Sequence, residues 1–256
     1  MINIRKREKK GFTLAEVLIT LAIIGIVASL TIPTLINYAF EQQSISRLKK
    51  TYAVLAEAVL EWQSANECIG DSNQCPEYRP EYDNNAVAVG RAIAPYLKYV
   101  QAYFGPSDTV GKTISWLPDT AYLINGQTIS YANWLTLLPD RHQIEYGFGS
   151  YFLLQDGTTL IITGAHHYYY VIIDINGPQK PNRIAKDIFL ASFWTPNHKT
   201  FSPFPTNGYR SPSTYGVCGD TASNKCSADD GHSLTAYVLA HNKLPDLKAM
   251  GYPTSP

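Results

Sequence analysis

The stretch Gly11–Ile32, GFTLAEVLITLAIIGIVASLTI, decides the architecture of this chain. It holds about twenty mostly apolar residues, which is the length that a helix needs to cross a bilayer core of ~30 Å. One ionisable side chain, Glu16, lies near its start. Because a carboxylate at membrane depth costs roughly 2.5–3.5 kcal/mol on insertion scales, we expect Glu16 to have a partner and a role.

Five basic residues precede this stretch and are interrupted only by Glu8. Basic residues beside a span stay on the cytoplasmic side, so the far end of the span is predicted to lie outside the cytoplasm. A secretory signal peptide would be cleaved after the apolar region, at a small-x-small site. Ala28-Ser29-Leu30 is not a clean site of this kind, because Pro33 and further helical sequence follow it.

The text GFTLAEVLITLAIIGIVA resembles the N-terminus of the type IV prepilin family, which contains pilins and type II secretion pseudopilins. In that family a short basic leader ends in Gly, the next residue is usually Phe, and a Glu follows four residues later. Gly11, Phe12 and Glu16 occupy these positions here. The resemblance implies a leader over residues 1–11, cleavage between Gly11 and Phe12 by a prepilin peptidase, and methylation of the new Phe12 amine. Pro33 stands where pilin helices carry a kinking proline.

Cleavage would give Glu16 a positively charged partner, the α-amine of Phe12. Within one helix the two groups lie a turn apart, because positions four apart share a face. Between subunits, Glu16 of one helix can neutralise the amine of a neighbour, which would set the axial stagger of a filament. The alternative is a Glu near the membrane interface that stays hydrated or protonated.

The same helix is predicted to continue beyond the membrane, so that residues 12–65 form one helix with its membrane half at 12–32. Large apolar residues recur in its second half at alternating spacings of three and four, which places them on one face. These residues are Ile45, Leu48, Tyr52, Leu55, Val59 and Trp62. We expect this stripe to pack on a soluble head; a coiled coil is the alternative, although the stripe lasts only about three heptads.

Residues 66–256 are predicted to form a globular head outside the membrane. A helix is expected from Asn85 to about Phe104. Two dipeptides that suit tight hairpin turns, Asn125-Gly126 and Asp156-Gly157, predict two β-hairpins. The text around Asp156-Gly157 and the later DINGPQKPNRIAKDIF also resemble the heads of bacterial pilin-like proteins.

β-Branched and aromatic residues predict strands over 121–124, 127–130, 151–155, 158–163, 167–175 and 188–194. Consecutive hairpins imply an antiparallel meander with one face on the long helix and the other partly hydrated. A long irregular loop is expected over residues 195–227, which are rich in Pro, Ser, Thr and Gly. The predicted fold class is therefore α+β, a long N-terminal transmembrane and amphipathic helix packed on a pilin-like antiparallel head, with an irregular C-terminal loop region.

The four cysteines form two local pairs, Cys68 with Cys75 and Cys218 with Cys226. In an exported head these pairs suggest two small loop-closing disulfides, although three pairings exist for four cysteines. A zinc site is the alternative, but neither pair has the C-x2-4-C spacing that such sites use.

The segment Asp174–Asp187 is the main candidate for site chemistry. Asp174, Asn176, Asn182 and Asp187 offer oxygen ligands, and Ca²⁺ takes six to eight oxygens. Major pseudopilin heads are known for a calcium-binding loop, and this segment is partly similar to it, although it lacks the D-x-D-x-D-G order. The alternative is a structural turn in which Asn and Asp bond to their own backbone.

Charge and motifs exclude several functions. Removing the leader's five basic residues and one acidic residue from 21 of each leaves a net charge of −4. Nucleic-acid binding needs a concentrated basic face, so this charge argues against it. No catalytic constellation is present, so we expect no enzyme.

The resemblance implies a structural subunit, a pilin, minor pilin or pseudopilin, of a type IV pilus or type II secretion-like filament. Its expected partners are the prepilin peptidase, other subunits, the assembly platform of the bacterial inner membrane and membrane lipid, and its head would be extracytoplasmic. The alternative function is a membrane-tethered extracytoplasmic binding protein that does not polymerise.

Overall fold

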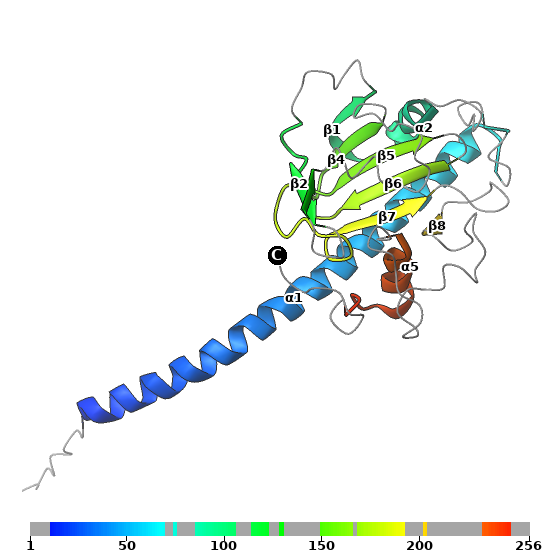
Figure 1. Cartoon of the computed structure of the whole chain (residues 1–256). Coiled ribbons are helices and arrows are strands. Elements are labelled where there is room, and N and C mark those ends of the chain that lie inside the picture. Colours follow the sequence, from blue (N-terminus) through cyan, green and yellow to red (C-terminus); the bar gives the residue numbers. More distant parts are fainter. Residues whose placement is uncertain are drawn as a thin grey trace, which may run out of the picture. The chain divides into compact units, whose positions relative to one another are not determined.

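A computed structural model of the 256-residue chain is shown in Figure 1. It describes residues 11–69, 74–75, 85–105, 114–122, 128–130, 149–165, 168–192, 202–203 and 232–246. The chain divides into two compact units, Met1–Gln42 and Gln43–Pro256. The helix α1, Leu14–Ala65, contributes residues to both units.

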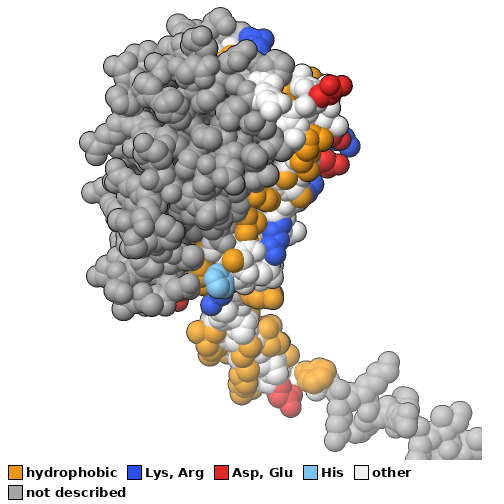
Figure 2. Space-filling model, turned by 90° about the vertical axis from the view of Figure 1, so that its right-hand side faces the viewer, with side chains coloured by type: hydrophobic (Ala, Val, Ile, Leu, Met, Phe, Trp, Pro, Cys, Tyr) orange, Lys and Arg blue, Asp and Glu red, His pale blue; other side chains and the backbone are white. Residues whose placement is uncertain are grey.

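The part of α1 in the first unit is apolar and exposed. Figure 2 shows hydrophobic side chains gathered on this part of the helix, and Leu18 and Ile24 are 57% and 63% exposed. By length and composition, α1 is a candidate membrane span, and none of the residues in its most apolar window is buried inside the chain. The helix therefore presents an apolar surface that its own unit does not cover.

Polar side chains in this apolar part bond to the helix itself. Ser29 Oγ donates to the carbonyl of Ile26 at 2.7 Å, and Thr31 Oγ1 donates to the carbonyl of Val27 at 2.9 Å. Hydroxyl groups bonded in this way are tolerated in lipid, where unsatisfied polar groups are costly. Pro33 lies inside α1 and removes one backbone donor from it.

The second half of α1 buries the predicted stripe in the head. Its large apolar residues pack with Phe152 and Leu160 of the head in one core cluster. Of the six predicted residues, Tyr52 is half-buried and five are buried: Ile45, Leu48, Leu55, Val59 and Trp62. The stripe is therefore part of the core of the head, and the expectation of packing on the head is confirmed.

The predicted helix up to about Phe104 is wrong beyond Ile93. The helix α2 spans Asn85–Ile93, a 3₁₀ turn follows over Ala94–Tyr96, and strand β1 spans Tyr99–Phe104. Pro95 lies within that turn, and Leu97 is already extended, with φ −100° and ψ 132°. Because proline disfavours helix in the residue before it and lacks a donor, the chain leaves the helix here and pairs with the sheet instead.

Six antiparallel strands form the main sheet in the order β1-β4-β5-β6-β7-β8. The strands other than β1 are β4 Ser150–Leu154, β5 Thr159–Ala165, β6 Tyr168–Asp174, β7 Ile188–Ser192 and β8 Ser202–Pro203. The strands β2 Thr120–Tyr122 and β3 Thr128–Ser130 form a separate antiparallel pair. Consecutive strands β4 to β7 are neighbours, so the predicted meander and the α+β pilin-like layout are confirmed.

The turn between β4 and β5 is built by Asp156-Gly157. The Leu154 N–H donates to the Thr158 carbonyl at 2.8 Å, and Asp156 Oδ1 accepts the Thr158 N–H at 3.2 Å. Gly157 has φ +84°, a conformation that side chains disfavour. The dipeptide thus makes the tight hairpin that its sequence predicts.

Two short helices pack on the main sheet. On α2, a Cβ at Gly90 would lie 2.0 Å from Ser150 Oγ, so α2 approaches β4 closely. The helix α5, His232–His241, buries Val238 and accepts the Leu190 N–H of β7 on Thr235 Oγ1 at 2.9 Å. Glycine on one helix and a hydroxyl on the other fix these two contacts.

Candidate functional site

The first candidate site is the junction that precedes α1. Phe12 is 89% exposed, and no heavy atom lies within 4 Å of the place where a side chain on Gly11 would begin. No described residue of the chain covers the bond between Gly11 and Phe12, so this bond is accessible to an enzyme. Sequence and structure agree that this bond lies before the helix, which starts at Leu14.

Thr13 and Glu16 cap the start of α1. Glu16 Oε2 accepts the Thr13 N–H at 2.8 Å and the Thr13 hydroxyl at 2.9 Å. The Glu16 N–H in turn donates to Thr13 Oγ1 at 3.2 Å. These reciprocal bonds form a capping box, in which a Thr and a Glu three residues later satisfy the free donors of a helix end.

Thr13 is a site residue that the sequence analysis missed. The signal was present, since Thr-x-x-Glu directly before an apolar run indicates a capping box. The capping box gives Glu16 a partner within its own chain: the carboxylate already accepts two hydrogen bonds from Thr13 before cleavage. The predicted partner, a free amine at Phe12, can exist only after cleavage.

The second candidate site is the loop between β6 and β7, where the two acidic side chains bond to backbone groups. Asp174 Oδ1 accepts the N–H groups of Asn176 at 3.3 Å and Gly177 at 2.8 Å. Asp187 Oδ2 accepts the Asn182 N–H at 2.7 Å, and its Oδ1 accepts the N–H of Arg183. The Asp174 end of the loop thus has the geometry of an Asx turn, whereas Asp187 accepts from residues that precede it.

Two oxygens of this loop remain buried without a hydrogen bond, Asp174 Oδ2 and Asn176 Oδ1. Burial, followed by the neighbouring charge of Asp187, raises the pKa of Asp174 well above its usual value. Burial likewise raises the pKa of Asp187 to about 6. Two buried carboxylates, one of which keeps an oxygen without a partner, offer the kind of oxygen ligand that a hard cation takes.

The four predicted ligands do not contribute equally to this place. Among the described residues, no cluster of three or more His, Cys, Asp or Glu side chains exists, so any cation would also need amide or carbonyl oxygens. Asn182 is committed elsewhere, because its side-chain amide nitrogen, in the orientation that satisfies its neighbours, donates to the carbonyls of Gln179 at 2.7 Å and Gly177 at 3.1 Å. The remaining set is Asp174, Asn176 and Asp187.

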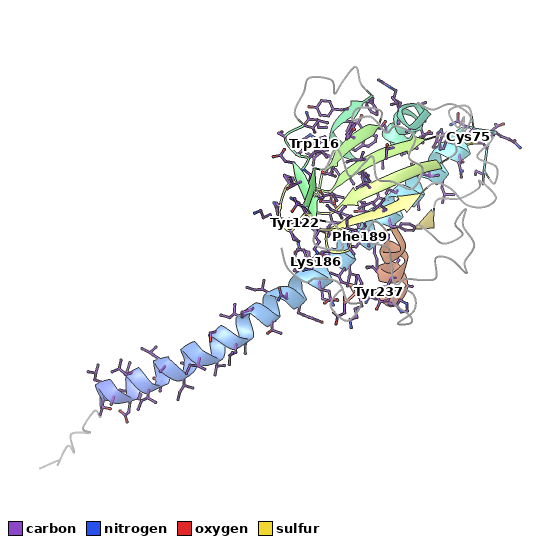
Figure 3. The ribbon with its side chains drawn as sticks, viewed as in Figure 1. Cys75, Trp116, Tyr122, Lys186, Phe189 and Tyr237 are labelled. Carbon is purple, nitrogen blue, oxygen red and sulfur yellow. A yellow bond between two sulfur atoms is a disulfide. The ribbon has the colours of Figure 1, made fainter. Side chains whose placement is uncertain are left out.

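The tip of this loop is held by the small sheet. The Tyr122 N–H of β2 donates to the Asn182 carbonyl at 2.8 Å, and the Ile184 N–H donates to the Tyr122 carbonyl at 3.1 Å. Figure 3 shows Tyr122 near the part of the loop that carries Lys186. The loop is therefore held by hydrogen bonds at both its ends and at its tip. The contact at the tip could not be predicted from the sequence, because Tyr122 and Asn182 are far apart along the chain.

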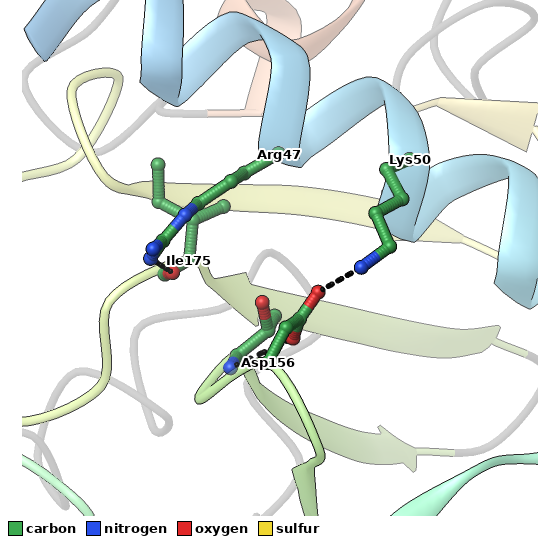
Figure 4. Close-up of polar contacts among 5 residues, drawn as sticks. Arg47, Lys50, Asp156 and Ile175 are labelled. Atoms are coloured by element: carbon green, nitrogen blue, oxygen red, sulfur yellow. Dashed lines mark hydrogen bonds and ion pairs between the residues drawn. The ribbon is translucent and has the colours of Figure 1, made fainter.

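Two basic residues of α1 reach this end of the head (Figure 4). Arg47 Nη1 donates to the Ile175 carbonyl at 2.9 Å, and Lys50 Nζ lies 2.7 Å from Asp156 Oδ2. Burial raises the pKa of Asp156, but hydrogen bonds from Lys50 and Thr158, with the charge of Lys50, lower it overall. The helix is thus attached to both the β4–β5 turn and the β6–β7 loop.

A disulfide follows the end of α1. Cys68 and Cys75 are bonded, with Cα atoms 5.3 Å apart, and both residues are buried. Figure 3 labels Cys75 at this end of the head. The predicted partner pair, Cys218 and Cys226, lies outside the described residues.

Comparison with known proteins identifies the N-terminal segment. The family model of the prokaryotic N-terminal methylation motif matches residues 6–32. Comparisons with curated proteins and with solved structures gave no match. The chain thus carries the N-terminal methylation motif, the signature of type IV pilins and pseudopilins, at the start of a long apolar helix that leads into an α+β head.

Proposed function

We propose that this chain is the precursor of a pilin-type structural subunit, a pilin, minor pilin or pseudopilin, of a type IV pilus or type II secretion-like filament. A prepilin peptidase cleaves it between Gly11 and Phe12 and methylates the new amine. The observation that carries this proposal is the methylation motif at residues 6–32, which lies over an accessible Gly11–Phe12 junction and an exposed apolar helix. The motif points to a structural role rather than to catalysis.

The proposed location is the bacterial inner membrane, crossed once, with the head on the extracytoplasmic side. Basic residues before a span favour the cytoplasm for the leader. The Cys68–Cys75 disulfide supports an oxidising compartment for the head, because disulfides are rare in the cytosol.

Assembly follows from the exposed apolar surface of the first unit. Lipid covers this surface before assembly, and the corresponding helices of neighbouring subunits cover it in a filament. Moving Glu16 into that apolar bundle is unfavourable unless its charge is matched. The Phe12 amine of a neighbouring subunit supplies the matching charge, while Thr13 holds the carboxylate in position.

The first test is mass spectrometry of the mature chain from the producing cell. We expect its first residue to be Phe12, with the mass of one added methyl group. A mature chain that begins at any other residue would contradict the proposal. A Gly11→Val variant should keep its leader, because the family motif requires the glycine.

The second test is the Glu16→Ala variant, with Asp119→Ala as a matched control on the exposed surface of the head. Glu16→Ala should be cleaved as efficiently as the unmodified chain but should be lost from filaments released by shear. The control should behave as the unmodified chain. Normal incorporation of Glu16→Ala would refute the charge pairing. An unmodified chain that stays entirely with the membrane after shear would instead support a tethered protein that does not polymerise.

We further propose that the β6–β7 loop holds a structural Ca²⁺ through Asp174, Asn176 and Asp187, with Asn182 shaping the loop. The unbonded, buried Asp174 Oδ2 supports this proposal, since a cation would supply its missing partner. The test is thermal unfolding of the full chain in detergent with Ca²⁺, Mg²⁺ or a chelator. Ca²⁺ should raise the unfolding temperature, and Asp174→Asn should abolish the rise. Equal unfolding temperatures in all three conditions would end the calcium proposal.

A further inference from the structure

The half of α1 within the head has a second, outward face. It lies opposite the buried stripe, and Figure 2 shows charged side chains standing among hydrophobic ones along this side of the helix. We call its exposed residues Lys49, Lys50, Ala53, Glu57, Leu60 and Glu61 the outer face. Leu60 is 54% exposed although it is apolar, which is a reason to look for something that covers it.

Charge is segregated along the outer face. Its basic end is Lys49 and Lys50, and its acidic end is Glu57 and Glu61. The centres of these two groups are about 14 Å apart, because an α-helix rises 1.5 Å per residue. The face is therefore a row with a positive and a negative end and little charge between them.

Of these four charges, Lys50 alone has an ion-pair partner among the described residues, Asp156. Lys49, Glu57 and Glu61 make no ion pair with any described residue, and Lys50 remains 62% exposed beside Asp156. Glu57 and Glu61 are four residues apart, a spacing at which like charges weaken a lone helix. A cation from another molecule would relieve this repulsion.

We propose that the outer face binds the outer face of a second copy of this chain, parallel and displaced along the helix axis by about 14 Å. At this offset Lys49 of one copy meets Glu57 and Glu61 of the other. The inference rests on the proposed function, because a shared membrane orientation is what makes the two helices parallel. Parallel helices without an offset would bring like charges together, which is unfavourable.

The same offset covers the exposed leucine. Leu60 of one copy comes level with Lys50 of the other, whose methylene stem can lie on apolar surface while its ammonium group keeps its ion pair with Asp156. Ala53, between the two charged ends, is small enough for the helices to approach closely.

The contact also has the right symmetry for a filament. The basic end of one copy binds the acidic end of the next, so a pair of copies keeps one unmatched end of each sign. Such a heterologous contact repeats without closing, which generates open helical assemblies. The pairing of Glu16 with a neighbour's Phe12 amine spans four residues, or about 6 Å, and belongs to a different neighbour in the same helical array.

Charge reversal tests the proposal in cells that assemble the unmodified chain. Lys49→Glu, and separately Glu57→Lys with Glu61→Lys, should each reduce the sheared filament fraction about tenfold, because repulsion replaces attraction at every repeat. Combining all three substitutions should restore most of the filament. The matched controls are Lys98→Glu and Asp119→Lys, which change exposed charges elsewhere on the head. Unchanged filament yield in the reversed variants, or no recovery in the combined variant, would overturn the proposal.

Cysteine cross-linking gives an independent readout. Lys49→Cys combined with Glu61→Cys should yield a ladder of cross-linked chains with a short thiol reagent, whereas either substitution alone should not. Strong dimers from Lys49→Cys alone would show an unshifted contact and would overturn the offset. The proposed function fails if the unmodified chain is absent from sheared filaments; this inference fails if the chain is present there and the double variant gives no ladder.

Discussion

The two halves of α1 differ in the exposure of their apolar side chains. Before Gln42, leucines and isoleucines lie on all sides and are exposed; after it, most of the large apolar residues gather on one side and are buried, with Leu60 as an exposed exception. One helix thus serves a lipid or filament environment at one end and a protein core at the other. The difference teaches that identical residue types carry different energetic weight along a single helix.

The sharpest test of this contrast compares two leucines in the same half of α1. Leu55 is fully buried, whereas Leu60 is 54% exposed. Leu55→Ala should lower the free energy of unfolding of the head by about 2–5 kcal/mol, the range for cavity-forming changes in a core. Leu60→Ala should leave it nearly unchanged. Denaturant unfolding of the full chain in detergent measures both; equal effects would remove the distinction between the faces.

Glycine substitutions extend the comparison to both halves. A methyl group at Gly90 would meet Ser150, so Gly90→Ala should destabilise the head by about 1–3 kcal/mol. Adding Ser150→Gly should recover part of this loss. At Gly25 in the exposed half, nothing lies within 4 Å of an added methyl group, so Gly25→Ala should leave the unfolding of the head unchanged. A tolerated Gly90→Ala would contradict the close approach of α2 to β4.

The buried carboxylates of the head predict that its stability depends on pH. The pKa of Asp187 is raised from 3.8 to about 6, so its protonated form is favoured in the folded state. The stability from this effect is fully present below the unfolded pKa and is lost as the pH rises through the folded pKa. With a chelator present, we expect the head to lose about 1 kcal/mol between pH 5 and 7. Asp187→Asn should flatten that slope, and an unchanged slope in the variant would refute the assignment.

The smallest expected effect concerns the attachment of α1 to the β4–β5 turn. Lys50 and Asp156 form a partly exposed ion pair, and such pairs contribute about 0.2–1 kcal/mol. Lys50→Ala should lower stability by no more than this, and added salt should reduce the difference. A double-mutant cycle with Asp156→Ala measures the pair directly; a coupling energy of zero would show that the contact is only geometric.

Local patterns predicted those features of the fold that nearby residues determine. The stripe of α1, the turn at Asp156-Gly157 and the meander of strands follow from periodicity and turn chemistry. Residues 99–104 became a strand rather than helix because they pair with β4, some fifty residues further along, and nothing local reveals that partner.

The candidate sites also divide into features that a local motif predicts and features that depend on contacts between distant segments. The processing junction and Glu16 are encoded in one short motif, and even the missed Thr13 had a local signal. The β6–β7 loop was recognised from its residue types, but the burial of Asp174 beside Asp187 and the anchoring of Asn182 by Tyr122 depend on contacts between distant segments. Composition gives the available ligands, and only the folded chain shows which of them converge.

The hydrogen bond that the Thr235 hydroxyl accepts affects how the edge of the sheet can interact when copies of the head lie close together. An unpaired strand at a sheet margin can recruit a foreign strand and start aggregation. Here β8 pairs with Ala191 and Ser192, and Thr235 takes the adjacent donor of Leu190. The Leu190 donor at this margin is therefore occupied, which makes it harder for a strand of a packed neighbour to pair with β7 at this point.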